Sequence, residues 1–228
     1  MIDPLEAEAL ALSLRVAAWS VLCSLPVGLA TAYLLARFDF WGKTALDGLV
    51  HLPLVVPPVV VGYLLLVALG RRGVVGGWLY DSFGVTIAFT WQGAAIAAAV
   101  MAFPLMVRAM RLSLEAVDTR LEAAARTLGA GRLRVFATVT LPLMAPGILT
   151  GAVLAFARSL GEFGATITFV SNIPGETRTL PLALYTATQL PDGEALAARL
   201  AVIAIVLALA ALFASEILAR AVKRRIGP

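Results

Sequence analysis

The chain of 228 residues is poor in the residues that build metal centres and disulfide frameworks. Its single cysteine, Cys23, excludes a disulfide framework and a cysteine-based metal cluster. Its single histidine, His51, excludes a histidine-rich metal site and is better explained as an interfacial residue than as a ligand. We therefore expect no metal site and no cofactor bound by this chain.

Motifs for catalysis are also missing. Neither HExxH nor GxSxG occurs. Gly42-Lys43-Thr44 resembles the tail of a phosphate-binding loop, but the position that needs the first glycine holds Arg37, and the segment follows an apolar span instead of a buried strand. The sequence predicts that the chain is not an enzyme. If ATP drives it, ATP and magnesium bind to another subunit.

Charged residues are scarce, and this scarcity identifies the solvent. They make up 14% of the chain, hydrophobic residues make up 61%, and the mean hydropathy is +0.92. Typical soluble domains are about 25% charged and about 45–50% apolar, so much of the surface must face a lipid bilayer. The net charge of +4 then reflects membrane topology, and we expect no nucleic-acid partner.

Five apolar segments are long enough to cross a bilayer as helices. They cover residues 14–36, 46–70, 88–107, 144–160 and 197–219. No segment alternates with period two, and backbone groups in lipid need internal hydrogen bonds, so a helical bundle is favoured over a barrel. The prediction is a single all-α, polytopic membrane domain over residues 1–228, with a loop at residues 108–142.

Basic residues in the connections predict the orientation. One alternate set holds twelve: Arg37, Lys43, Arg108, Arg111, Arg120, Arg126, Arg132, Arg134, Arg220, Lys223, Arg224 and Arg225. The other set holds five: Arg15, Arg71, Arg72, Arg178 and Arg199. The excess assigns the 108–142 loop and the C-terminus to the cytoplasm, and the N-terminus to the opposite side.

Two features inside the apolar segments are candidates for the transport path. Pro57 and Pro58 interrupt the second segment, where a break or kink is expected, and broken helices often line pathways, although a kink can equally serve packing. Arg158 and Glu162 stand four residues apart and can pair. Charges at membrane depth face a protein interior or a water cavity, so Arg158 either helps to shape an anion path or belongs to a pair that fixes helix packing. Gly161 and Gly164 weaken the helix here, which predicts a break and a re-entrant or outer-cavity segment at 162–170.

The stretch from Thr119 to Pro142 is a basic insert that favours a short helix. Thr119 and Glu122 have the spacing of a capping box, and Gly129 suits the residue that closes a helix. A face of Leu121, Ala124, Ala125 and Leu128, ringed by Arg120 and Arg126, is suited to docking in a groove of another protein. Lying on lipid headgroups is the alternative.

This insert resembles the cytoplasmic loop of ABC-importer permeases, whose pattern is Glu-Ala-Ala, three residues, Gly, nine residues, Ile-x-Leu-Pro. Gly129, Leu141 and Pro142 fit the spacing, with Val139 for the isoleucine, whereas Glu122 stands one residue early. The stretches RSLGEFGA and SNIPGETRT resemble the permeases of molybdate importers, with sulfate, thiosulfate and tungstate permeases as close relatives.

The resemblance implies a fold like that of type I importer permeases, in the bacterial inner membrane. It also implies a homodimer, two ATPase subunits docked on the insert and a periplasmic oxyanion-binding protein. Arg178, in the outer loop 171–179, is a candidate contact for that binding protein. The implied activity is inward transport of molybdate, with sulfate, thiosulfate or tungstate as alternative cargoes. A secondary anion carrier independent of ATP remains the less favoured class, because no inverted repeat is evident.

Overall fold

The structure is a computed structural model that describes residues 3–226. Its helices are α1 (Pro4–Arg37), α2 (Lys43–His51), η1 (Leu52–Leu54), α3 (Pro58–Leu69), α4 (Val74–Phe83), α5 (Trp91–Glu115), α6 (Thr119–Thr127), α7 (Arg132–Val135), the π-helical η2 (Phe136–Thr140), α8 (Leu141–Leu160), α9 (Gly164–Val170), α10 (Leu180–Thr188) and α11 (Glu194–Ile226). No strand occurs in this range. The all-α prediction is therefore confirmed.

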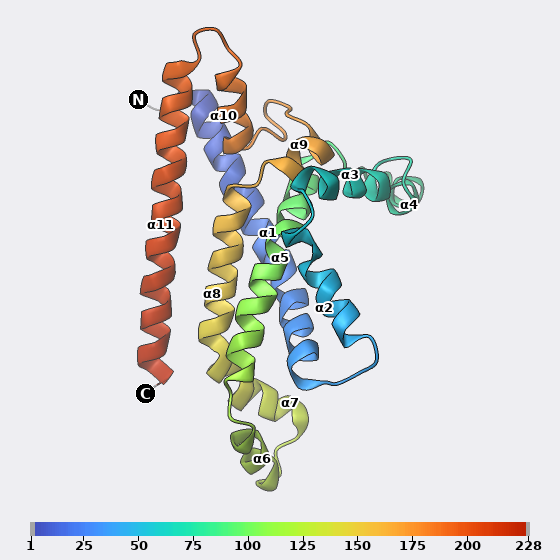
Figure 1. The fold of residues 1–228 in the computed structure, drawn as a ribbon, viewed down its shortest axis with the longest axis vertical. Coiled ribbons are helices and arrows are strands. Elements are labelled where there is room, and N and C mark those ends of the chain that lie inside the picture. Colours follow the sequence, from blue (N-terminus) through green and yellow to red (C-terminus); the bar gives the residue numbers. More distant parts are fainter. Residues whose placement is uncertain (1–2, 227–228) are drawn as a thin grey trace.

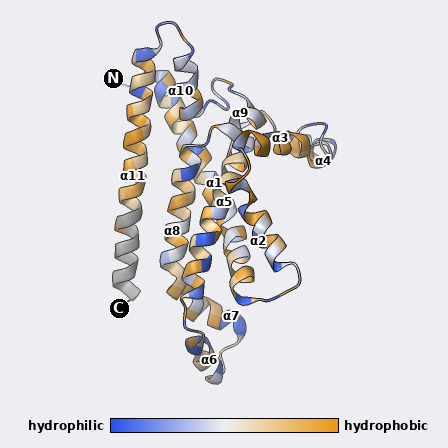
Figure 2. Cartoon of the chain, viewed as in Figure 1, coloured by the Kyte–Doolittle hydropathy of each residue, from blue (hydrophilic) through white to orange (hydrophobic). Residues whose placement is uncertain are grey.

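Four long helices, α1, α5, α8 and α11, run side by side along the molecule (Figure 1). Four helical stretches are long and apolar enough to cross a membrane: α1, α5, the continuous run Arg132–Leu160 that includes α8, and α11 up to Ala214. If the bent pair formed by α2–η1 and α3 counts as one span, the described residues contain five. Apolar residues cover α3 and the upper part of α11, whereas polar residues gather near α6 and α7 (Figure 2). The side chains of Arg220, Lys223, Arg224 and Arg225, which entered the orientation count, lie outside the described part.

Small residues bring the long helices into close contact. Gly147 of α8 lies against Ser113 of α5, and a Cβ there would stand 2.1 Å from the serine Cβ. Gly151 of α8 likewise lies against the backbone of Met106 on α5. Lipid offers no hydrophobic drive for helix association, so close backbone packing of this kind holds the bundle together.

The second apolar segment is not one helix. Instead, α2 and η1 end near Leu54, and α3 leaves at 111° to them, so α3 lies across the upper end of the bundle (Figure 1). Pro53, Pro57 and Pro58 explain the break, because proline lacks an amide donor and clashes with the preceding turn. The predicted break is confirmed, and the 46–70 segment consists of a bent pair of helices.

Helix α5 extends further than the sequence indicated. It begins at Trp91 after the capping residue Thr90 and continues to Glu115, so the first eight residues of the predicted 108–142 loop belong to it. Arg111 and Glu115 form an ion pair of 2.8 Å on this extension. A proline inside the helix, Pro104, does not end it.

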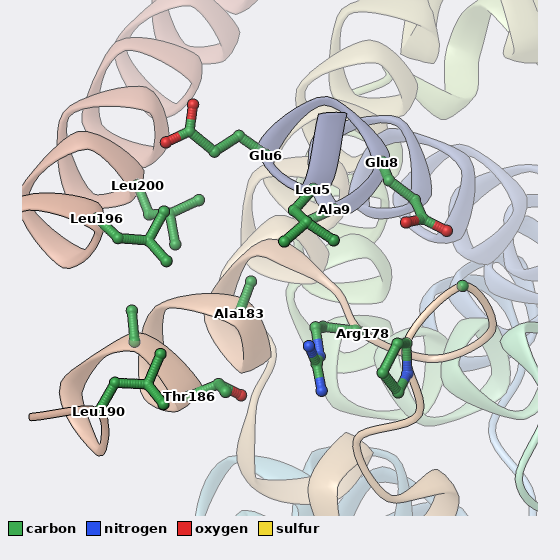
Figure 3. Close-up of a pocket in the computed structure, with 13 residues that line it drawn as sticks. Leu5, Glu6, Glu8, Ala9, Arg178, Ala183, Thr186, Leu190, Leu196 and Leu200 are labelled. Carbon is green, nitrogen blue, oxygen red and sulfur yellow. The ribbon is translucent and has the colours of Figure 1, made fainter. Parts of the chain in front are cut away.

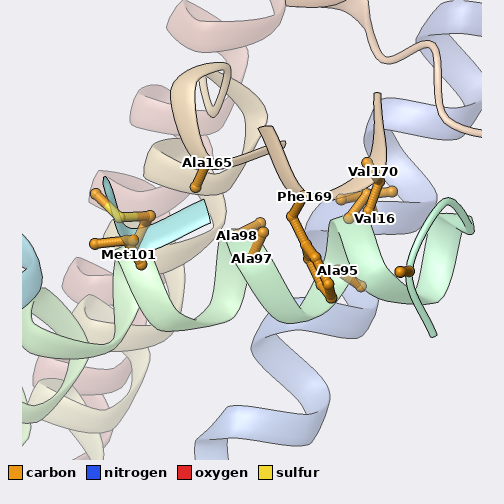
Figure 4. Close-up of a cluster of buried hydrophobic side chains, with 11 residues drawn as sticks. Val16, Ala95, Ala97, Ala98, Met101, Ala165, Phe169 and Val170 are labelled. Atoms are coloured by element: carbon orange, nitrogen blue, oxygen red, sulfur yellow. The ribbon is translucent and has the colours of Figure 1, made fainter. Parts of the chain in front are cut away.

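The upper end of the bundle is closed by α9 and α10. Helix α8 ends at Leu160 and Gly161 follows in a turn, which confirms the predicted break. Phe169 and Val170 of α9 are fully buried and lie against α5 beside Val16 of α1 (Figure 4). The 162–170 segment is therefore part of the core of this end of the molecule.

Candidate functional site

Helix α6, at the lower end of the molecule, begins and ends with two local devices (Figure 1). Asp118 caps it, because the carboxylate accepts a 2.9 Å hydrogen bond from the amide of Arg120. The predicted capping box of Thr119 and Glu122 is wrong, since the preceding aspartate is the better acceptor at the start of the helix. Gly129 has a φ of +85°, and the amides of Gly129 and Ala130 bond back into the last turn, so the predicted closure is confirmed.

The outer face of α6 is apolar and exposed. Leu121 is 49% exposed and Leu128 is 89% exposed, Ala124 is exposed as well, and Ala125 is partly covered. Arg120 lies exposed at the start of the same helix. Leu133 of α7, which was not singled out from the sequence, adds a further exposed apolar side chain. Large apolar side chains beyond the ends of the long helices are the kind of surface that another protein covers.

Glu122 points the opposite way and is buried. Its Oε1 accepts hydrogen bonds of 2.8 Å from Nη2 of Arg37, at the end of α1, and of 2.8 Å from the hydroxyl of Thr140 in η2. Its Oε2 lies 3.5 Å from Arg126. The glutamate therefore ties α6 to α1 and to the segment that leads into α8.

The partners of Glu122 were not found from the sequence. Arg37 stands 85 positions away and was counted only as a topology signal, and Thr140 occupies the variable position of the Ile-x-Leu-Pro pattern. Leu141 and Pro142 are the first residues of α8 and are not part of α6. They belong instead to an unbroken helical run from α7 through η2 into α8, a run long enough to cross a membrane.

Arg158 and Glu162 form the predicted pair, at the upper end of α8. Nη1 of Arg158 lies 2.7 Å from Oε2 of Glu162, whose side chain is 2% exposed. Oε1 of Glu162 also accepts a 2.8 Å hydrogen bond from the amide of Ala165, in the first turn of α9. The glutamate thus joins α8 to α9 through Oε1, whereas its buried Oε2 faces Arg158 as an ion pair and has no hydrogen-bond partner among the described residues.

The proline break contacts the same region. A Cβ on Gly164 would stand 2.7 Å from the Cβ of Pro58, and one on Gly62 would stand 2.5 Å from the carbonyl oxygen of Ala165. Helix α3 is thus packed closely on α9, next to Glu162. The structure brings Pro58, Arg158 and Glu162 into one region, whereas Pro57 is exposed.

Arg178 lies at the upper end, far from α6 along the bundle. Its Nε donates a 2.9 Å hydrogen bond to Oδ1 of Asn172. It lines a cavity of 110 Å³ together with Glu8 of α1 and Thr186 of α10, and lies between these two side chains in Figure 3. Nearby, Glu6 pairs with Arg199 of α11 at 2.7 Å.

Comparisons with known proteins give consistent results. Residues 24–226 match the family described as the binding-protein-dependent transport system inner membrane component. The chain is 65% identical over 225 residues to the molybdenum transport system permease protein ModB of Escherichia coli strain K12, which covers 99% of this chain and 98% of that protein. ModB of Haemophilus influenzae is 57% identical over 223 residues, with 98% and 97% covered.

A sulfate permease is less similar. The sulfate transport system permease protein CysT of Escherichia coli is 39% identical over 176 residues, which cover 77% of this chain and 64% of that protein. Among solved structures, a bacterial ABC transporter that imports alginate matches with a TM-score of 0.75 and 18% identity over 96% of this chain and 80% of that one. An inward-facing MetNI methionine ABC transporter matches with a TM-score of 0.67 and 19% identity, over 96% and 94%.

Proposed function

The chain belongs to the family of inner membrane components of binding-protein-dependent transport systems, and from this premise we propose that it is the permease subunit of an ATP-driven importer that carries molybdate inward. It is a multi-pass inner-membrane protein with the fold of type I ABC importer permeases. The 65% identity to ModB along nearly the whole chain is the observation that supports molybdate as the transported ion.

Other cargoes and classes are less well supported. The sulfate permease CysT shares 39% identity over a shorter range, so sulfate and thiosulfate are the alternative cargoes, together with tungstate. A secondary carrier would need an ion-coupling site of its own. Arg158 and Glu162 neutralise each other at 2.7 Å and hold α9 in place, which suits a structural pair better.

The proposed assembly contains two copies of this chain, two ATPase subunits and a periplasmic oxyanion-binding protein. ATP and magnesium bind to the ATPase subunits, and this chain holds no cofactor. Helix α6 faces the cytoplasm, as does the C-terminus, and the N-terminus faces the periplasm; the distribution of basic residues supports this orientation. Arg178 and the 171–179 loop then lie on the side where the binding protein docks.

We further propose that α6 is the coupling helix. The exposed Leu121 and Leu128 suit a groove in the ATPase subunit, and Arg120, Ala124, Ala125 and Gly129 complete that surface. Glu122 acts from the inner face by holding α6 to α1 and η2. Movement of the ATPase subunits is passed through α6 and α7 to Leu141, Pro142 and the rest of α8, and shifts the permease between two states.

Replacement of the docking side chains tests this proposal. Burial of one leucine side chain contributes about 1.5–3 kcal/mol, so Leu121→Glu with Leu128→Glu removes most of the apolar contact and adds two charges. We expect the ATPase subunit to be lost on co-purification and uptake to stop. Thr127→Glu is the matched control, because Thr127 is exposed on α6 outside the Leu121–Leu128 face. If the double variant kept a bound ATPase and full uptake, α6 would not be the coupling helix.

A further inference from the structure

A second charged region lies behind α6, around the contacts that hold this helix to α1 and η2. It is a cavity of 470 Å³ between the end of α1, the inner face of α6, and α7 with η2. Three guanidinium groups line it, those of Arg37, Arg126 and Arg132. Glu122 supplies the one carboxylate that lines it within the described part of the chain.

The positive charges of this cavity are not balanced within the described residues. Glu122 is shared by Arg37 at 2.8 Å and Arg126 at 3.5 Å. Arg132 has no carboxylate within 4.0 Å among the side chains that the structure describes. Nε of Arg37 is buried and has no hydrogen-bond partner in that same part of the chain. Three positive charges and one negative charge leave an excess of two.

An excess of two positive charges on guanidinium groups selects a ligand class. The guanidinium fork binds oxyanions through paired, charge-assisted hydrogen bonds. The hydroxyl-bearing Thr119 also lines the cavity, in the first turn of α6, where the helix dipole favours negative charge. The volume is many times the share of about 30 Å³ that one water takes in the liquid, so a small hydrated ion fits.

We propose that this cavity binds a tetrahedral oxyanion with two negative charges, such as molybdate or sulfate, as the free ion. The ion contacts Arg126 and Arg132 from the open side of the cavity, beside Arg37, which also lines it. It links α1, α6 and α7 through one ligand. The inference rests on the proposed function for its choice of ion, because the imported molybdate is released on the same side of the membrane.

Equilibrium binding of radioactive molybdate tests the site. The sample is the purified complex of permease and ATPase subunits, in nanodiscs of zwitterionic lipid, without the periplasmic binding protein and without nucleotide. We expect saturable binding of one ion per permease chain, displaced by sulfate and not by chloride. Loss of one charge-assisted hydrogen bond weakens binding about tenfold or more, so Arg132→Gln lowers the affinity by at least that factor, and Arg126→Gln with Arg132→Gln abolishes it.

Arg134→Gln is the matched control. Arg134 is exposed on the same helix as Arg132 and does not line the cavity, so its loss removes the same charge without changing the affinity. Arg132 and Arg126 are themselves exposed, and co-elution with the ATPase subunit checks that each variant folds. Equal affinities in Arg132→Gln and Arg134→Gln would overturn the placement of the site.

Two further outcomes separate the site from its alternatives. Absence of saturable binding in a complex that takes up molybdate with ATP and binding protein overturns the site and leaves the proposed function standing. Failure of uptake, with binding intact, overturns the proposed function instead. If anionic lipid in the nanodisc displaces molybdate, a headgroup phosphate is the natural occupant, and the free ion is overturned.

Discussion

Substitution of the ion pair between Arg37 and Glu122 is the most direct way to weaken the contact of α6 with α1 without changing the exposed face of α6. Glu122→Gln keeps the shape of the side chain and its hydrogen bond from Thr140, but it removes the charge that faces Arg37. Arg37→Gln leaves the carboxylate without its main partner. Both side chains are shielded, at 15% and 8% exposed, so water replaces the lost contact only in part.

A hydrogen bond to a charged group contributes about 1.5–3 kcal/mol, so either substitution should lower the free energy of local opening of α6 by about 2 kcal/mol. That corresponds to amide exchange about 30-fold faster. In the double variant the two glutamines can bond to each other. The combined loss should therefore fall short of the sum of the single losses by about 1 kcal/mol or more.

Hydrogen exchange read by mass spectrometry, on peptides that cover α6 in the nanodisc-embedded complex, measures this effect. Peptides from α11 serve as an internal reference, and Arg134→Gln serves as the control variant. Unchanged amide exchange rates in α6 for both single variants would refute the role of the ion pair in holding α6 to α1. Strictly additive losses in the double variant would show that the two side chains act independently.

Three further predictions concern the upper end and the packing of the bundle. Arg158→Gln leaves the buried carboxylate of Glu162 without its charged partner, so we expect poor assembly on size-exclusion chromatography. Adding Glu162→Gln should restore assembly. Full assembly of Arg158→Gln with lost uptake would instead assign Arg158 to the anion path. Gly62→Ala places a Cβ 2.5 Å from the carbonyl oxygen of Ala165 and should lower the free energy of unfolding by about 1–3 kcal/mol, as followed by thermal denaturation. Gly48→Ala is the control, because a Cβ there would meet nothing within 4 Å. Equal melting temperatures of the two variants would contradict the close contact between α3 and α9. Gly147→Ala should lower the yield of folded protein, since its Cβ would meet Ser113 at 2.1 Å, and normal yield would refute tight α5–α8 packing.

Hydropathy and charge predict the large features of this fold well because they act over many residues. A helix of twenty apolar residues has few alternatives in lipid, so the all-α bundle, the proline break and the turn at Gly161 followed directly. The ends of the helices were harder to predict. Helix α5 continues to Glu115 because Arg108 and Arg111 stay on its surface, where charge does not prevent helix formation.

The candidate site was predicted on its exposed face and missed on its buried one. Leu121 and Leu128 share a face by helical spacing alone, which is a local property. Glu122 looked like a capping residue because its partner Arg37 is 85 positions away, at the end of another helix. Single-sequence patterns cannot pair two charges at that distance, and the cavity lined by Arg132 depends on the same long-range folding.

Uptake of labelled oxyanion into proteoliposomes tests the central claim most directly. The vesicles contain this chain with its ATPase subunit, and the binding protein is added outside with ATP trapped inside. We predict that uptake of molybdate requires both ATP and the binding protein. We also predict that a tenfold excess of sulfate does not greatly reduce this uptake. Uptake of molybdate without ATP, or uptake of sulfate in preference to molybdate, would contradict the account.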